Sequence, residues 1–96
     1  MLEVALKECK VRGQAAADAE RTYRIKLAEK ILTLREQGLP ATLIGDVARG
    51  DKTVADLKFE RDCASVVYDN AKEAVMAFKK QIDVLREQIE REWNNA

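Results

Sequence analysis

Apolar and polar positions in the second half of the chain repeat every seven residues. Alternating steps of three and four residues meet the following positions: Val54, Leu57, Arg61, Ala64, Tyr68, Ala71, Val75, Phe78, Ile82, Leu85, Ile89 and Glu92. Ten of these twelve residues are uncharged and fit a helix core, and Arg61 is the one charge inside the run. A period of 3.5 residues predicts one long helix that packs this row, here called the seam, against another helix.

A helical pattern also runs through the first third of the chain, and we expect a helix over residues 2–37. Its apolar positions follow a helical period with some drift: Leu2, Leu6, Cys9, Ala16, Ala19, Tyr23, Leu27, Ile31 and Leu34. Gly13 lies in the weakest stretch, because glycine costs about 1 kcal/mol relative to alanine inside a helix. This helix could therefore break at Gly13.

Gly38 and Pro40 end the first helix, since glycine suits the left-handed position after a helix and proline cannot continue one. Residues 38–52 form a connector that holds a short helix. Thr53 and Asp56 have capping-box spacing, which predicts that the second long helix covers residues 53–94. Two long helices with such a connector fold most simply as an antiparallel, coiled-coil-like hairpin. We therefore expect a single all-α domain over residues 1–96.

The hairpin prediction includes a register. If the chain turns near residue 45, the numbers of facing residues sum to about 90. Arg61 would then face Glu29, and Tyr68 would face Thr22 and Tyr23. Trp93 continues the drift of the seam and should pack near Leu2; the alternative is an exposed Trp93 that anchors an interface. The connector would cover the tip of the hairpin.

Further apolar residues lie off the seam of the second helix: Phe59, Val66, Val67, Met76 and Val84. Exposed apolar residues in such numbers are hard to explain in a monomer this small. We expect these residues to mediate self-association, most simply as a dimer of two hairpins that forms a four-helix bundle. The alternative is that the connector and a folded-back N-terminal segment cover them.

Composition narrows the possible functions. The chain has 17 Lys and Arg against 17 Asp and Glu, and no His. A protein held on nucleic acid by phosphate contacts usually carries a positive excess, so non-specific nucleic-acid binding is disfavoured. Without His, the commonest metal ligand and general base is missing. No nucleophile–base pair, phosphate loop or metal motif is visible, and we expect neither an enzyme nor a cofactor.

The first residues contain no long apolar run, so we expect no membrane span and no signal peptide. Cys9 and Cys63 have no metal-binding spacing. We expect both to be free thiols, which suits a reducing cytoplasm.

Arg61 is the sharpest anomaly because it is a charge at a core position. It could hold a small anion or a partner's carboxylate through its planar fork of donors, with stacking on Tyr23. Arg21, Arg24 and Lys26 add positive charge near Tyr23. The structural alternative is that Arg61 pairs with Glu29 across the hairpin, or with its neighbours Glu60 and Asp62, and fixes the register.

The connector loosely resembles a helix-turn-helix, with Arg49 and Lys52 as its candidate contacts. Against DNA binding, the helix that would read bases carries Asp56, Glu60 and Asp62, which would repel phosphates.

Four runs carry a resemblance to a known group of proteins. They begin at Tyr23 (YRIK), Gly38 (GLPATLIGDVARG), Phe59 (FERD) and Arg91 (REWNN). In these runs the chain resembles small uncharacterised proteins of phages and prophages of Gram-positive bacteria. The resemblance implies a short viral protein in the cytoplasm of a bacterial host, and such proteins often work by binding.

Three hypotheses follow. The first is a non-enzymatic interaction protein that associates with itself and presents helix faces to a host or phage protein. The second is a phage counter-defence protein, either an inhibitor or an oligomer that sequesters a small anionic nucleotide signal near Arg61, Tyr23 and Arg24. The third is a nucleic-acid accessory protein that reads through the connector.

Overall fold

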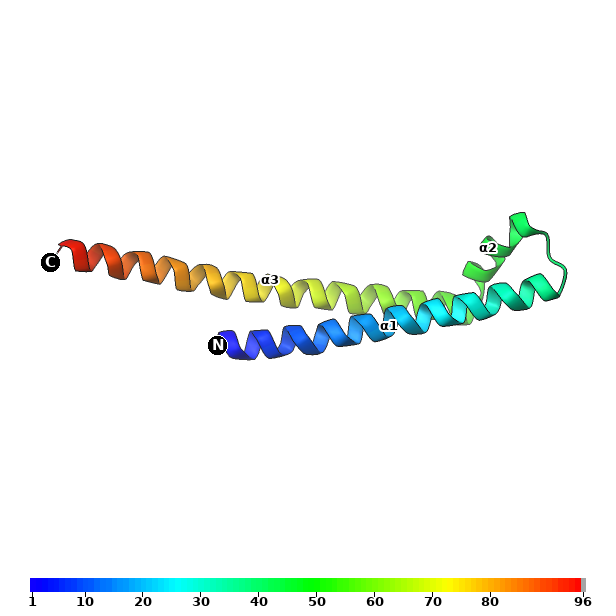
Figure 1. The fold of residues 1–96 in the computed structure, drawn as a ribbon, viewed down its shortest axis with the longest axis horizontal. Helices are drawn as coiled ribbons and strands as arrows, with labels where there is room; N and C mark the ends of the chain where they lie inside the picture. The colour runs from blue at the N-terminus through cyan, green and yellow to red at the C-terminus, as the bar shows by residue number, and fades with distance from the viewer. Residues whose placement is uncertain (96) are drawn as a thin grey trace.

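The protein is a long, two-stranded helical hairpin whose connector forms a third, short helix (Figure 1). The computed structural model describes residues 1–95. They form α1 (Leu2–Glu36), α2 (Ala41–Gly50) and α3 (Lys52–Asn95). The long helices α1 and α3 run antiparallel, and α2 lies against them at the closed end. The molecule measures 80 × 23 × 15 Å. The predicted all-α hairpin with a short helical connector is therefore confirmed.

The turn after α1 is a Schellman motif, in which a left-handed residue lets the chain close the helix end. Gly38 has a φ of +82°, as its position after the helix predicts. Its N–H donates to the Arg35 carbonyl at 3.0 Å, and the Leu39 N–H donates to the Leu34 carbonyl at 3.2 Å. Leu39 also packs against the apolar cluster that contains Leu34, and an apolar contact of this kind usually accompanies the motif. Gly38 and Leu39 thereby satisfy two carbonyls at the end of α1.

Asp51 caps the start of α3, so the predicted cap at Thr53 is wrong. The Val54 N–H donates to the Asp51 carboxylate at 3.2 Å, which is the usual bond from an N-cap to the third residue of a helix. The same carboxylate lies 3.5 Å from Lys30 Nζ on α1. The bond from Val54 and, less strongly, the charge of Lys30 lower the pKa of Asp51 below its ordinary value of 3.8.

Substituting Asp51→Ala should lower the Tm by several degrees near neutral pH, since the cap bond and the Lys30 contact are both lost. A carboxyl whose pKa is lowered by folding stabilises the fold above its ordinary pKa of 3.8, and this contribution disappears as the pH falls through the folded value. The Tm difference between the parent and Asp51→Ala should therefore shrink in acid. Thermal melts at a series of pH values measure it, and a difference that is constant with pH would contradict the role of the carboxylate.

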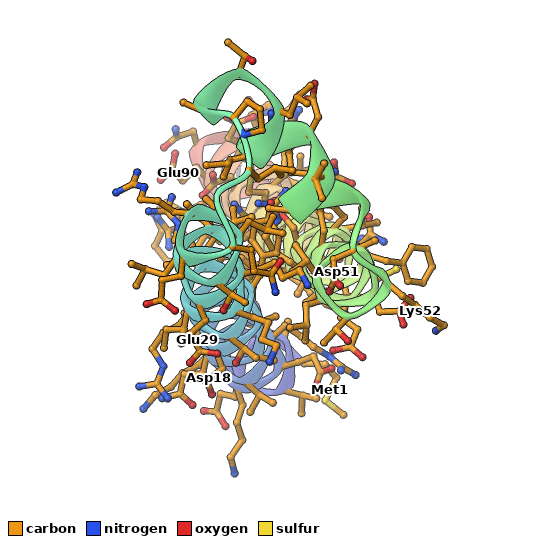
Figure 2. All side chains as sticks on the ribbon, turned by 90° about the vertical axis from the view of Figure 1, so that its right-hand side faces the viewer. Met1, Asp18, Glu29, Asp51, Lys52 and Glu90 are labelled. Carbon is orange, nitrogen blue, oxygen red and sulfur yellow. The ribbon has the colours of Figure 1, made fainter. Side chains whose placement is uncertain are left out.

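The best-buried part of the protein is at the closed end, where all three helices meet. Leu34, Ile44 and Ala48 form a cluster there, and Ala48 is completely buried. Val54, at the start of α3, is 1% exposed. Figure 2 looks along the rod from this end and shows α2 lying across the pair of long helices, with charged side chains such as Asp18 and Lys52 projecting outward. We call this closed end the tip.

The register of the hairpin differs from the predicted one. Three contacts of α1, two with α3 and one with its cap Asp51, fix it: Gly13 with Tyr68, Glu20 with Arg61, and Lys30 with Asp51. In each pair the residue numbers sum to 81, rather than about 90. The predicted pairs of Arg61 with Glu29, Tyr68 with Tyr23 and Trp93 with Leu2 are therefore wrong. The last turns of α1 pack against α2, so α3 begins beside Lys30 instead of at the end of α1.

This register leaves the last turns of α3 without α1 beside them. Leu2, the first residue of α1, lies level with about residue 79 of α3, since the paired numbers sum to 81. Residues 80–95, here called the overhang, continue as a single helix past the N-terminus of α1 (Figure 1). At 1.5 Å per residue the overhang is roughly 24 Å long. Every residue from 79 to 95 is exposed.

Gly13 does not break α1, which is continuous from Leu2 to Glu36. Instead, Gly13 is where α1 comes close to Tyr68. A Cβ at position 13 would lie 3.1 Å from Cε1 and 3.2 Å from Cζ of the Tyr68 ring. The missing side chain therefore makes room for an aromatic ring on the facing helix.

Candidate functional site

Arg61 lies in a small charged cluster between α1 and α3. Its guanidinium donates to Asp62 Oδ1 from Nε at 3.1 Å and from Nη2 at 2.9 Å. Across the hairpin, Nε lies 3.4 Å from Glu20 Oε2. The guanidinium also stacks over the Tyr23 ring, at 4.6 Å from its centroid. Arg61 is thus in contact with two carboxylates and one aromatic ring.

Arg61 makes the ion pairs that its structural alternative predicts. One acid partner is the predicted one, and the other is a different residue. Asp62 is the adjacent acid that the sequence suggested. The acid across the hairpin is Glu20 instead of Glu29, whose nearest basic partner is Lys26 at 3.8 Å. The sequence could not show Glu20, because finding it requires the register.

The electrostatics of the cluster favour its internal pairs. Hydrogen bonds from Arg61, and then from Lys58, lower the pKa of the Asp62 carboxyl. The hydrogen bond to Asp62 raises the pKa of Arg61. Both groups therefore stay charged around neutral pH, and the positive charge of Arg61 is shared between carboxylates.

A shallow groove of about 490 Å³ runs beside this cluster. Its lining residues come from both long helices: Gly13, Ala16, Ala17, Glu20, Arg61, Asp62, Ser65 and Tyr68. Its charged members are Glu20, Asp62 and Arg61, and the two carboxylates also pair with Arg24 and Lys58. Each cation of the cluster already has a carboxylate partner, so an anion would have to compete with Glu20 and Asp62 for it.

Of the other candidate cations near Tyr23, only Arg24 belongs to the cluster around Arg61. Arg24 reaches the same cluster indirectly, because its Nε lies 2.7 Å from Glu20 Oε1 while Arg61 contacts the other oxygen of that carboxylate. Lys26 pairs with Glu29 on the outside of α1. Arg21 is exposed. The structure therefore brings Arg24 and Arg61 together at Glu20, with Tyr23 stacked against Arg61, and leaves Lys26 and Arg21 apart.

The connector candidates are held in local ion pairs. Arg49 Nη2 lies 3.3 Å from Asp46, and Lys52 Nζ lies 2.9 Å from Asp56. The pKa of Lys52 is raised by this hydrogen bond to Asp56. Each cation is exposed and has an acid within one helical turn, so a phosphate would have to compete with that carboxylate.

The candidate self-association residues are all exposed on α3. Their exposed fractions are 69% for Phe59, 58% for Val66, 41% for Val67, 68% for Met76 and 55% for Val84. The alternative, that the connector or a folded-back N-terminal segment covers them, is wrong, since α1 is continuous and α2 packs at the tip.

The overhang carries the seam beyond the end of α1. Ile82, Leu85 and Ile89 occupy seam positions and have no part of α1 beside them, with exposed fractions of 40%, 57% and 64%. Trp93, one turn further, is 82% exposed instead of packed near Leu2. The same heptad pattern that packs α3 on α1 therefore presents an apolar helix face to solvent.

A second row on α3 was missed by the sequence reasoning. It consists of eight exposed residues without charge: Cys63, Val67, Asn70, Ala74, Ala77, Gln81, Val84 and Gln88. These residues are spaced alternately by four and three, as in a seam, and we call them the charge-free row. The row lies about 110° around α3 from the seam, at 100° per residue. The signal in the sequence is a set of uncharged residues at heptad spacing, most of which are not large and apolar.

Among residues 1–95, no three His, Cys, Asp or Glu side chains gather as a metal site would require. Across the same residues, no helix combines the length and the apolar character needed to cross a bilayer. Cys9 and Cys63 are free. Comparisons with protein-family models, curated proteins and solved structures give no significant match.

Proposed function

We propose that this chain is a non-enzymatic interaction protein that binds a helix of a partner protein through the overhang of α3. The observation that carries the proposal is that Ile82, Leu85 and Ile89 continue the seam where α1 has ended. A helix face with anchors at these spacings is a common means of helix–helix recognition. Trp93 adds a large aromatic side chain of the kind that dominates binding energy at interfaces.

The cost of exposing these residues supports the proposal. Covering a Leu or Ile side chain contributes about 1.5–3 kcal/mol, and the overhang presents three such side chains on one face. A partner helix laid along this face would take the place that α1 has along the rest of the seam. The phage resemblance extends the proposal to a host or phage protein in a bacterial cytoplasm as the partner.

Arg61 has a structural role in this proposal. Its contacts with Glu20 and Tyr23 join α3 to α1, and its contact with Asp62 orients the guanidinium. Because its positive charge is already shared by two carboxylates, the cluster gives no support to a nucleotide signal as ligand. The paired cations of the connector likewise give no support to nucleic-acid binding.

The test compares Leu85→Glu/Ile89→Glu with the parent as immobilised bait in a lysate of a Gram-positive bacterium. Quantitative mass spectrometry should identify a protein whose recovery falls at least tenfold with the double variant, since each Glu places a charge on the seam. Titration of that purified protein should reproduce the loss. Met76→Glu is the matched control, because Met76 is exposed on the same helix but lies off the seam and off the charge-free row. Equal binding by Leu85→Glu/Ile89→Glu and the parent would overturn the proposal.

A further inference from the structure

The charge-free row is a packing surface beside the overhang seam. Charged residues make up 35% of the chain, yet eight successive heptad positions on an exposed helix face carry none. The row extends from Cys63 to Gln88, which is about 39 Å of helix. Its residues are small, aliphatic or amide-bearing, and such side chains allow two helices to approach closely.

We infer that a second copy of this chain occupies the charge-free row, with the two α3 helices antiparallel. The inference rests on the proposed function, binding through α3, and names one partner. In this arrangement each residue of the row faces another residue of the same row in the second copy, and we call each facing pair a layer. The residue numbers in every layer sum to 151. The layers pair Cys63 with Gln88, Val67 with Val84, Asn70 with Gln81, and Ala74 with Ala77, each partner coming from the second copy.

Each layer joins residues that suit one another. Val67 meets Val84, so aliphatic layers lie toward both ends of the contact. Asn70 meets Gln81, and two amides can exchange hydrogen bonds. Ala74 meets Ala77 beside the two-fold axis, where small side chains permit the closest approach of the helices.

The charges that flank the row are complementary in the same arrangement. Glu73 and Lys80 lie along one edge of the row, and the antiparallel pairing sets Glu73 opposite Lys80 of the second copy. The two-fold axis repeats this pair, which gives two ion pairs between the copies. A parallel pairing in register would put Glu73 near Phe78 and Lys80 near Leu85, and would form no such pair.

The elongated single chain has enough accessible surface for a dimer interface. The accessible surface is 7653 Å², whereas a monomeric globular protein of 10.8 kDa has about 5500 Å². The surplus of roughly 2000 Å² exceeds the about 800 Å² that each partner buries in a stable complex. In the dimer, the overhang of each copy lies beside residues 56–71 of the other, and its seam stays open for the helical partner proposed above.

Cysteine cross-linking tests the pairing directly. Gln88→Cys is introduced together with Cys9→Ala, which leaves Cys63 and the new thiol at position 88. Positions 63 and 88 are about 37 Å apart in one helix, so a disulfide between them must join two copies. Mild oxidation should convert most chains to a covalent dimer, and peptide mapping should find the bond between positions 63 and 88.

The matched control is Glu90→Cys in the same Cys9→Ala background. Position 90 is two residues further along the helix and faces away from the charge-free row, so its cross-linking should be at least fivefold weaker. Equal cross-linking at positions 88 and 90 would overturn the inference. Bonds between identical positions, 63 to 63 and 88 to 88, would overturn the antiparallel arrangement.

Charge reversal gives a second, independent measurement. Glu73→Lys alone and Lys80→Glu alone should each raise the Kd of the dimer about tenfold in sedimentation equilibrium at low salt, because both ion pairs become repulsive. Combining the two substitutions restores opposite charges and should return the Kd to within about threefold of the parent. A double variant as weak as the single ones would overturn the inference.

The two proposals fail separately. If the parent stays monomeric and the Cys9→Ala/Gln88→Cys variant does not cross-link, while Leu85→Glu/Ile89→Glu still loses a partner protein, the dimer is wrong and the proposed function stands. If the parent dimerises as described and the same double variant loses no partner, the dimer stands without the helical partner.

Discussion

Replacing Val54 with aspartate should remove most of the free energy of unfolding of this protein. Val54 is 1% exposed at the start of α3, beside the tip where three helices meet. A buried carboxylate without a partner costs about 3–5 kcal/mol. The free energy of unfolding of a 96-residue protein is about 5–14 kcal/mol, and a rod with so few buried residues lies near the lower end. Urea titration followed by circular dichroism measures the loss.

Val47→Asp is the matched control for this substitution. Val47 belongs to α2 in the same part of the molecule, but it is 43% exposed, so the new carboxylate stays in water. Its free energy of unfolding should stay within about 1 kcal/mol of the parent value. If both variants unfolded at the same urea concentration, burial at the tip would not be what stabilises the fold.

Replacing Tyr23 with alanine should lower the free energy of unfolding by about 3 kcal/mol. Tyr23 is 6% exposed, and Arg61 stacks on its ring from the facing helix. The substitution removes the ring from the contact between α1 and α3 and leaves the guanidinium over a void. The urea midpoint should fall, while the denaturant dependence stays close to that of the parent.

Tyr23→Phe separates the ring from the hydroxyl. It keeps the buried face and the stacking surface for Arg61, and we expect a change below about 1 kcal/mol. If Tyr23→Ala were as stable as Tyr23→Phe, the stacked pair would not hold the two helices together, and Arg61 would be free for the alternative role of a ligand contact.

Local signals predicted the elements of this fold, because the elements depend on local properties. The heptad pattern from Val54 onward specified α3, and Gly38 followed by Pro40 specified the end of α1. Two long helical patterns joined by a short connector predicted a hairpin, because a short connector brings consecutive helices side by side.

The register could not be predicted, because it depends on where the connector packs. A chain that turned near residue 45, the middle of the connector, would have placed Arg61 opposite Glu29. Instead, Ile44 and Ala48 of α2 pack against Leu34 near the end of α1. Those last turns are then unavailable to α3, and the pairing shifts by about nine residue numbers.

The errors that remain have the same origin. Glycine propensity alone marked Gly13 as a weak point, but the ring of Tyr68 on the facing helix occupies the space that its side chain would need. At Arg61 the adjacent acid was evident from the sequence, whereas Glu20 became its partner only through the register. Charges and aromatic residues were found as candidates, and a row defined by missing charge was not.

The position of the tip also sets the order in which the chain can fold. Contacts among Leu34, Ile44 and Ala48 join residues close in sequence, so bringing them together costs little chain entropy. Once these contacts form, each further contact between α1 and α3 toward Gly13 and Tyr68 orders only a few more residues. The hairpin can therefore form progressively from the tip toward its open end. The overhang is then the last segment to order and the first to fray, and amide hydrogen exchange should quicken steadily from Val54 toward Trp93.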